Sequence, residues 1–149
     1  MTMRLTLHSD YSLRVLMFLA LKRGQLATIP EIAQAYDISR GHLMKVVHEL
    51  GTLGYVTTVR GRGGGLTLGR PAESIRVGEV LRKTEDSLSL VACFTKSEPG
   101  AGCRIDGACR LKGALAEAQR AFFDVLDKYT LADLVDGRAA PLRRQLRLA

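Results

Sequence analysis

The sequence predicts a mainly α-helical protein with one small β-hairpin: a winged helix-turn-helix domain followed by a long C-terminal dimerisation helix. Three helix-like segments precede residue 54, a glycine-rich hairpin pattern covers 55–68, and an amphipathic stretch begins at Leu111. Short helices joined by a tight turn and followed by a hairpin are typical of winged helix-turn-helix domains. With 149 residues and 46% hydrophobic composition, the chain is long enough to bury a core.

The first predicted helix begins at Ser9, a candidate N-cap, and stops at Gly24. Its apolar positions recur at helical spacing and are Leu13, Leu16, Met17, Ala20 and Leu21. The second helix follows a capping-box pattern, in which Thr28 caps the helix and Glu31 reaches back to the Thr28 amide. Pro30 is tolerated there because the first turn needs no amide donor.

The third helix is capped by Ser39 and ended by Gly54, after a short turn at Asp37 and Ile38. One side of this helix is apolar, formed by Leu43, Val46, Val47, Leu50 and Leu53. The next segment, 55–59, is β-branched and aromatic, 61–65 is almost entirely glycine, and 66–68 resumes the alternation. This order predicts a β-hairpin wing directly after the second helix of a helix-turn-helix.

The C-terminal half divides into four expected parts after the DNA-binding domain at 1–70. A connecting helix lies within 71–87, a cysteine-rich loop covers 88–110, a dimerisation helix covers 111–136, and a basic tail, expected to be frayed, covers 137–149. The last helix has a four-three apolar spacing that suits packing against another helix. Its apolar positions are Leu111, Leu115, Ala118, Phe122, Val125 and Tyr129.

Positive charge is concentrated where the winged pattern lies. The whole chain carries a formal charge of +7, with +5 in residues 1–70 and +2 in the remainder. This balance favours a polyanionic partner, and the pattern favours double-stranded DNA. Polar residues at the start of the third helix and arginines in the wing are suited to bases and phosphates. The candidate DNA-binding residues are Ser39, Arg40, His42, Lys45, Arg60 and Arg62.

The three cysteines of the chain, Cys93, Cys103 and Cys109, lie together in one glycine-rich segment. No leader-like start and no apolar run of membrane-spanning length is present, so we expect a cytoplasmic protein with no membrane partner. Structural disulfides are rare in that compartment, and clustered thiolates are good ligands for iron or zinc. The cluster therefore predicts metal or redox chemistry, although three ligands are one short of the usual four.

The chain resembles the iron-sulfur winged-helix transcriptional regulators of bacteria, most closely their nitric-oxide-sensing repressors. The resemblance runs nearly end to end, and its most specific part is the cysteine segment with the closing residues 129–134. The matching segments are Leu5-Thr6, Asp10-Tyr11, Ile38-Ser39, Tyr55-Val56-Thr57, Val59-Arg60-Gly61, Gly64-Gly65, Ser89 to Phe94, Cys103, Cys109 and Tyr129 to Leu134.

The resemblance implies a homodimer with one [4Fe-4S] cluster per subunit, held by the three cysteines and by an aspartate from the first helix of the partner chain. The matching aspartate is Asp10, and His8 is a nearby alternative ligand. Relatives that regulate cluster assembly use a histidine shortly after the third cysteine, where this chain has Lys112. The implied function is a repressor that releases operator DNA when nitric oxide nitrosylates the cluster or the cluster is lost.

Several alternatives stay open from the sequence. Three cysteines and a carboxylate could also hold a [2Fe-2S] cluster, and the chain could regulate iron-sulfur or iron homeostasis through a different cluster. A cluster-free thiol switch, in which cysteine oxidation alters DNA binding, fits the same residues. An enzyme or electron carrier is disfavoured because the sequence has no recognisable nucleotide motif and no obvious catalytic arrangement. Neither of these functions would explain the predicted wing.

Overall fold

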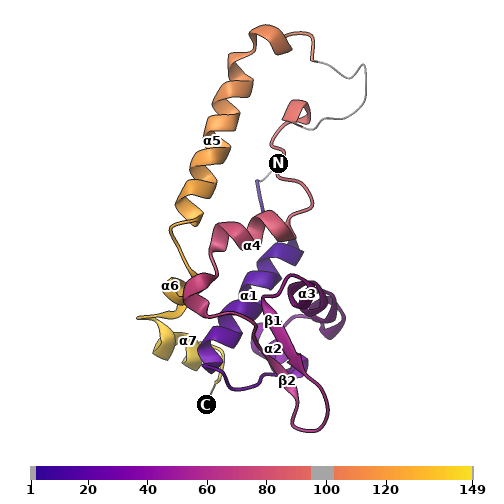
Figure 1. Ribbon diagram of the computed structural model, residues 1–149, viewed down its shortest axis with the longest axis vertical. Coiled ribbons are helices and arrows are strands. Elements are labelled where there is room, and N and C mark those ends of the chain that lie inside the picture. The colour runs from indigo at the N-terminus through magenta and orange to yellow at the C-terminus, as the bar shows by residue number, and fades with distance from the viewer. Residues whose placement is uncertain (1–2, 95–102, 149) are drawn as a thin grey trace.

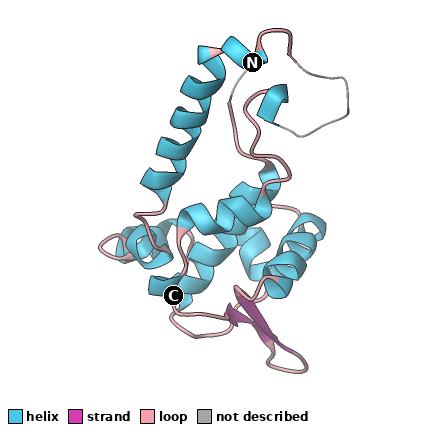
Figure 2. Ribbon diagram, turned by 45° about the horizontal axis from the view of Figure 1, so that its top comes forward, coloured by secondary structure: helices cyan, strands magenta, loops and turns pink. Residues whose placement is uncertain are grey.

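A computed structural model describes residues 3–94 and 103–148, and shows a helical body with one hairpin and a long projecting helix (Figures 1 and 2). The N-terminal half contains α1 (Leu7–Lys22), α2 (Ile29–Tyr36), α3 (Arg40–Thr52), β1 (Val56–Val59) and β2 (Gly65–Leu68). The C-terminal half contains α4 (Val77–Thr84), α5 (Arg110–Leu126), α6 (Leu131–Val135), α7 (Ala139–Gln145) and the short 3-10 turns η1 (Ala72–Ser74), η2 (Ala92–Phe94) and η3 (Asp106–Ala108). No helix in these described ranges is long and apolar enough to cross a bilayer.

The core joins α1 to the helix-turn-helix, the wing and α6. Phe18, Leu43 and Tyr55 are fully buried in it, from α1, α3 and the start of the wing. The strands form the predicted hairpin and pair antiparallel, with Val56 opposite Leu68 and Val59 opposite Gly65. Because α1 packs against both α3 and α4, a displacement of α1 would be transmitted to the helix-turn-helix.

The helix caps confirm two predictions and correct one. The Thr28–Glu31 capping box and the Ser39 cap are both present. The first helix, however, begins at Leu7, and Thr6 rather than Ser9 is its N-cap. Ser9 lies inside the first turn, where its hydroxyl is fully buried against that of Thr84. The local sequence favours Ser9 as a cap because it gives no sign of the hydrogen-bond partner, Thr84, which is 75 positions away.

The region predicted as a single helix over 111–136 consists of two helices. α5 ends at Leu126, and a new capping box between Thr130 and Asp133 begins α6. The intervening chain is held to the segment before α4, since the Val77 amide donates to the Tyr129 carbonyl and the Leu131 amide to the Ile75 carbonyl. The tail is also more ordered than expected, because it forms α7.

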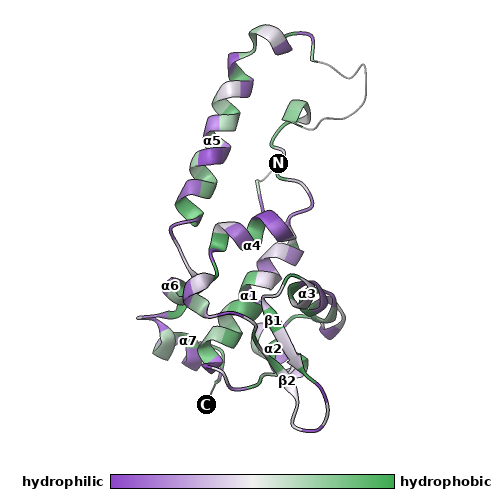
Figure 3. Ribbon diagram, in the orientation of Figure 1, coloured by the Kyte–Doolittle hydropathy of each residue, from purple (hydrophilic) through white to green (hydrophobic). Residues whose placement is uncertain are grey.

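The projecting helix α5 alternates hydrophilic and hydrophobic residues along its length (Figure 3). Only Phe123 on it is buried, against Val77 and Leu81 of α4. Five of the six predicted dimerisation positions are exposed, all but Leu115; among them Leu111 is 64% exposed, Val125 51% and Phe122 39%. The stripe that the sequence assigned to dimerisation is therefore largely uncovered within one subunit.

Candidate DNA-reading surface and sensor site

The recognition helix α3 presents the two basic residues that the sequence placed on its outer face. Arg40 and Lys45 are both exposed, while the apolar side of the helix, which includes Leu43 and Val46, is buried. Ser39 is exposed as well, but its hydroxyl accepts the His42 amide at 3.2 Å and so fixes the start of the helix. The helix therefore offers cations at its N-terminal end, the end that reads base edges in helix-turn-helix proteins.

His42 differs from the expectation that it points away from the body. It is only partly exposed, and its ring lies edge-on to Tyr11 of α1 with centroids 4.7 Å apart. The neighbouring His8 ring lies 6.4 Å from it, and His8 also contacts the Glu49 carboxylate further along α3. These side chains join the first turns of α1 to the recognition helix. A DNA contact by His42 stays a prediction.

The wing tip carries Arg60 and Arg62, and both are exposed. Gly61 and Gly63 have φ values of 96° and 70°, a left-handed backbone that favours glycine. Gly64 is constrained differently, since a Cβ there would lie 2.2 Å from the Val59 carbonyl oxygen. The glycines therefore make a tight turn that holds two guanidinium groups at the tip, as entry into a minor groove requires.

The base of the wing is tied to α4 by a polar cluster that sequence reasoning missed. The Tyr55 hydroxyl donates to Glu79 at 2.8 Å, and Arg70 and Lys83 bind the same carboxylate at 3.2 and 3.1 Å. Burial works to raise the pKa of Glu79, but these three donors outweigh it and hold that pKa below its ordinary value. These polar side chains come from separate elements of the fold, so no local sequence pattern predicts that they meet.

The cysteines lie in and around the segment that precedes α5. Cys109 is the N-cap of α5, with its sulfur accepting the Lys112 amide at 3.4 Å, and Cys93 and Cys103 are exposed. A hydrogen bond from Lys112 to Asp106 raises the pKa of Lys112. In the described ranges 3–94 and 103–148, no three potential ligands are close enough to hold a metal ion.

Asp10 lies in the first turn of α1, where it pairs with Arg14 at 2.9 Å. The carboxylate is 40% exposed. Arg14 contacts both oxygens of this carboxylate, but an exposed ion pair of this kind contributes about 1 kcal/mol or less, so it would not prevent Asp10 from binding another group. His8, the alternative ligand, is instead engaged with α3. The structure keeps Asp10 accessible, and within the described part of one chain Asp10 and the cysteines form no group that could hold a metal ion.

A second feature missed by the sequence fastens the first turn of α1 to the end of α4. The Thr6 amide and hydroxyl donate to Glu85 at 2.9 and 3.1 Å, and the Ser9 and Thr84 hydroxyls lie 2.8 Å apart. We call these four residues the α1–α4 clasp. The cysteine segment follows Glu85 directly, so the clasp joins the root of that segment to the helix that carries Asp10.

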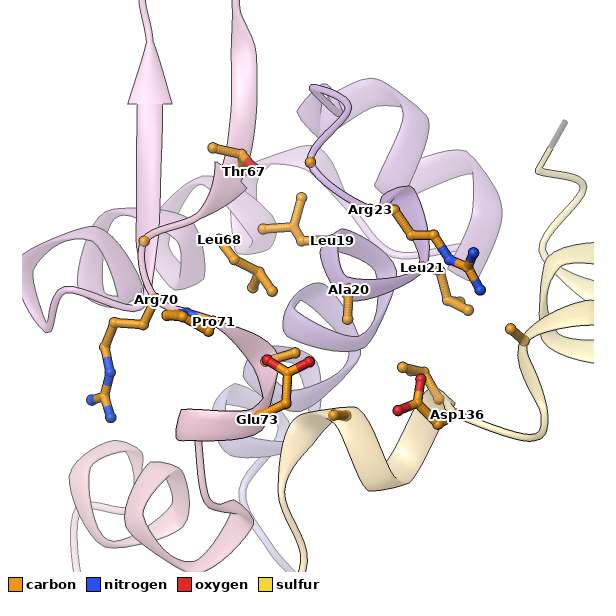
Figure 4. A pocket seen from close by; sticks show the side chains of 16 residues that line it. Leu19, Ala20, Leu21, Arg23, Thr67, Leu68, Arg70, Pro71, Glu73 and Asp136 are labelled. Atoms are coloured by element: carbon orange, nitrogen blue, oxygen red, sulfur yellow. The ribbon is translucent and has the colours of Figure 1, made fainter.

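A separate hollow of about 580 Å³ lies between the base of the wing, the C-terminal end of α1 and α6 (Figure 4). Its lining combines apolar side chains with four charged residues, Arg23, Arg70, Glu73 and Asp136. It contains neither cysteine nor histidine. The hollow is thus distinct from the predicted sensor residues.

Comparison with known proteins places the chain. The family described as "Rrf2: Iron-dependent Transcriptional regulator" matches residues 5–137. The chain belongs to the Rrf2 family. It is 54% identical over 137 residues to the HTH-type transcriptional regulator NsrR of Bacillus subtilis (strain 168), covering 91% of this chain and 92% of the relative. The NsrR of Geobacillus kaustophilus (strain HTA426) is 50% identical over 139 residues, covering 93% of both proteins.

Solved Rrf2-like structures agree with the fold. The global cysteine regulator CymR (YrzC) of B. subtilis superposes with a TM-score of 0.71 at 28% identity, covering 89% of this chain and 96% of that one. T. potens IscR gives the same TM-score at 24% identity, covering 89% and 86%, and supports the fold alone. The predicted winged-helix fold is confirmed. This Rrf2 chain is a DNA-binding transcriptional regulator and not an enzyme.

Proposed function

We propose that this regulator is a nitric-oxide-responsive repressor. It binds operator DNA as a homodimer that carries one [4Fe-4S] cluster per subunit. The DNA is released when nitric oxide reacts with the cluster. The observation that carries the proposal is the divided ligand set. Cys109 caps the N-terminal end of α5 and Cys93 and Cys103 are exposed, whereas Asp10 is accessible on α1. The relatives named NsrR, at 48–54% identity, support a shared function.

The donor chemistry fits an iron-sulfur cluster. Cys93, Cys103 and Cys109 are free thiols and would supply soft thiolate ligands. The N-terminal end of α5 favours negative charge on Cys109. Asp10 of the partner subunit would supply a carboxylate that leaves its weak pair with Arg14. When bound, the cluster would provide the iron with which nitric oxide reacts.

The contacts of α1 give a physical route from the sensor to DNA. The clasp fixes the root of the cysteine segment to the first turn of α1 through Thr6 and Glu85. The same turns of α1 reach the recognition helix through His8 and Glu49, and through Tyr11 and His42. If ligand binding by Asp10 holds α1 in place, its release lets α1 and α3 shift together. Repositioned base contacts would then weaken operator binding.

The uncovered apolar stripe of α5 supports the dimer. Burial of apolar surface contributes about 25 cal/mol per Å², so packing of this stripe against the same stripe of a second copy would stabilise a dimer. In the proposed dimer, the two α5 helices pack together through Leu111, Phe122 and Val125. This arrangement would bring the cysteine segment of one subunit towards α1 of the other.

Anaerobic native mass spectrometry with a nitric oxide titration tests the proposal. We expect a dimer that carries two clusters, and stepwise loss of intact cluster mass accompanied by loss of operator binding. A mass that corresponds to [2Fe-2S] would show that the cluster is not [4Fe-4S]. If the protein is colourless and its DNA binding changes with thiol oxidation, the proposal is wrong and the cluster-free thiol switch is correct.

Substitution of Asp10 tests the fourth ligand. Asp10→Ala should leave DNA binding possible but speed cluster loss, because one ligand is missing. Glu73→Ala, which removes an exposed carboxylate on η1 that is not a proposed ligand, is the control and should behave as wild type. Unchanged cluster absorbance and an unchanged nitric oxide response in Asp10→Ala would remove Asp10 from the ligand set.

A further inference from the structure

Met44 is exposed on the second turn of the recognition helix α3, with 59% of its surface open to solvent. It lies four residues after Arg40 and four before His48, and both of those residues are exposed. Helical positions four apart lie above one another, so the three side chains form one row. The buried side of α3 faces the core instead, through Leu43, Val46, Val47 and Leu50. Met44 therefore occupies the centre of the face that the fold presents to DNA.

Core packing does not explain this methionine. Within the described residues, Met44 belongs neither to the core cluster nor to the partly buried side chains packed on it. A thioether carries no charge and donates no hydrogen bond, so phosphate binding does not require it either. A contact with an apolar group of the DNA would remove the apolar carbon of Met44 from water, which is favourable.

The major groove offers one distinctive apolar group at its base edges, the C5 methyl of thymine. The N-terminal half of a recognition helix is the part that contacts those edges, and Met44 lies within the first turns of α3. We propose that Met44 determines operator specificity by packing against a thymine methyl in each half-site. The proposal rests on the DNA-binding function and adds which base is read and by which residue.

The surroundings of Met44 suit that contact. It borders a shallow groove of about 500 Å³ whose apolar lining includes Ile29 and Val47. Thr52 and Thr58 line the same groove and bring hydroxyl groups from α3 and β1. The unbranched side chain of methionine adapts to an irregular surface through its rotatable bonds. Met44 can thus rest on apolar carbon on one side and meet a methyl group on the other.

Thymine replacement in operator DNA tests the assignment. Anaerobically purified full-length protein is used to enrich duplexes from a random-sequence pool, and each thymine of the selected duplex is replaced in turn by deoxyuridine, which lacks only the methyl. Burial of one methyl group corresponds to about fourfold in affinity. We expect one thymine per half-site whose replacement weakens wild-type binding by about that factor.

Variants of α3 then connect the thymine to the residue. Met44→Ala should weaken binding to the parent duplex and become indifferent to deoxyuridine at that position, while Met44→Leu should retain the discrimination. Lys45→Ala, an exposed neighbour, should lose affinity in a salt-dependent way and still distinguish thymine from deoxyuridine. Because Met44 lies outside the core, thermal unfolding of Met44→Ala should match wild type.

Two outcomes separate the failure of this proposal from that of DNA binding itself. If the selected duplex is bound but Met44→Ala keeps the full deoxyuridine effect, or wild type shows none, the assignment of Met44 is wrong while the DNA-binding function stands. If wild type enriches no sequence from the pool, specific DNA binding fails, and the assignment fails with it.

Discussion

Substitution of Glu85 tests whether the α1–α4 clasp joins the sensor segment to the DNA-binding domain. Glu85→Ala removes the only carboxylate oxygen that accepts both the Thr6 amide, at 2.9 Å, and the Thr6 hydroxyl, at 3.1 Å. It also removes a negative charge from beside the N-terminal end of α1, where such a charge is favourable. The first turn of α1 should therefore become less firmly held.

The expected loss follows from the geometry. Hydrogen bonds to charged groups contribute about 1.5–3 kcal/mol, but Glu85 is only partly buried and water can replace part of the interaction. We expect the free energy of unfolding to fall by about 1–2 kcal/mol. For a protein of this size that corresponds to a decrease of about 2–8 °C in Tm. Glu85→Gln keeps an acceptor oxygen and should lose less.

Thermal and chemical unfolding of the purified protein measure the loss, with Glu73→Ala as the matched control because its carboxylate is exposed on η1. Operator binding by the cluster-loaded protein is the second readout, and should weaken for Glu85→Ala but not for Glu73→Ala. The reasoning is refuted if Glu85→Ala and the control unfold alike. Normal operator affinity and nitric oxide response despite lost stability would confine the clasp to a structural role.

Three further predictions concern the wing and α5. Because the folded-state pKa of Glu79 is lowered, its contribution to stability is present above the ordinary value of 4.5 and is lost as pH falls through the folded pKa. Glu79→Gln should flatten the decline in unfolding free energy below that pH, and an unchanged slope would contradict it. Arg60→Ala should reduce the slope of log affinity against log salt by about 1 per subunit if it contacts phosphate; an identical slope would place it away from DNA. Phe122→Glu with Val125→Glu should produce monomers in analytical ultracentrifugation, whereas a persistent dimer would locate the interface elsewhere.

Much of the fold was predictable because its signals are local. The capping box at Thr28 and Glu31, the Ser39 cap and the glycine-rich wing each depend on residues a few positions apart. The division of the last helix had a local signal too, since Thr130 and Asp133 form a capping box, but the continuous apolar spacing favoured one helix. The position of His42 had none, because its burial depends on Tyr11 in another helix.

The sequence by itself determined the winged-helix pattern, the concentration of positive charge in the first 70 residues and the three clustered thiols, since periodicity, composition and spacing are properties of the chain. Only the tertiary structure decided which distant groups meet. It joined Thr6 to Glu85 and Tyr55 to Glu79, and left Met44 exposed on the recognition helix. These features depend on the packing of separate elements, and hydrogen bonds between residues 79 and 24 positions apart leave no period in the sequence.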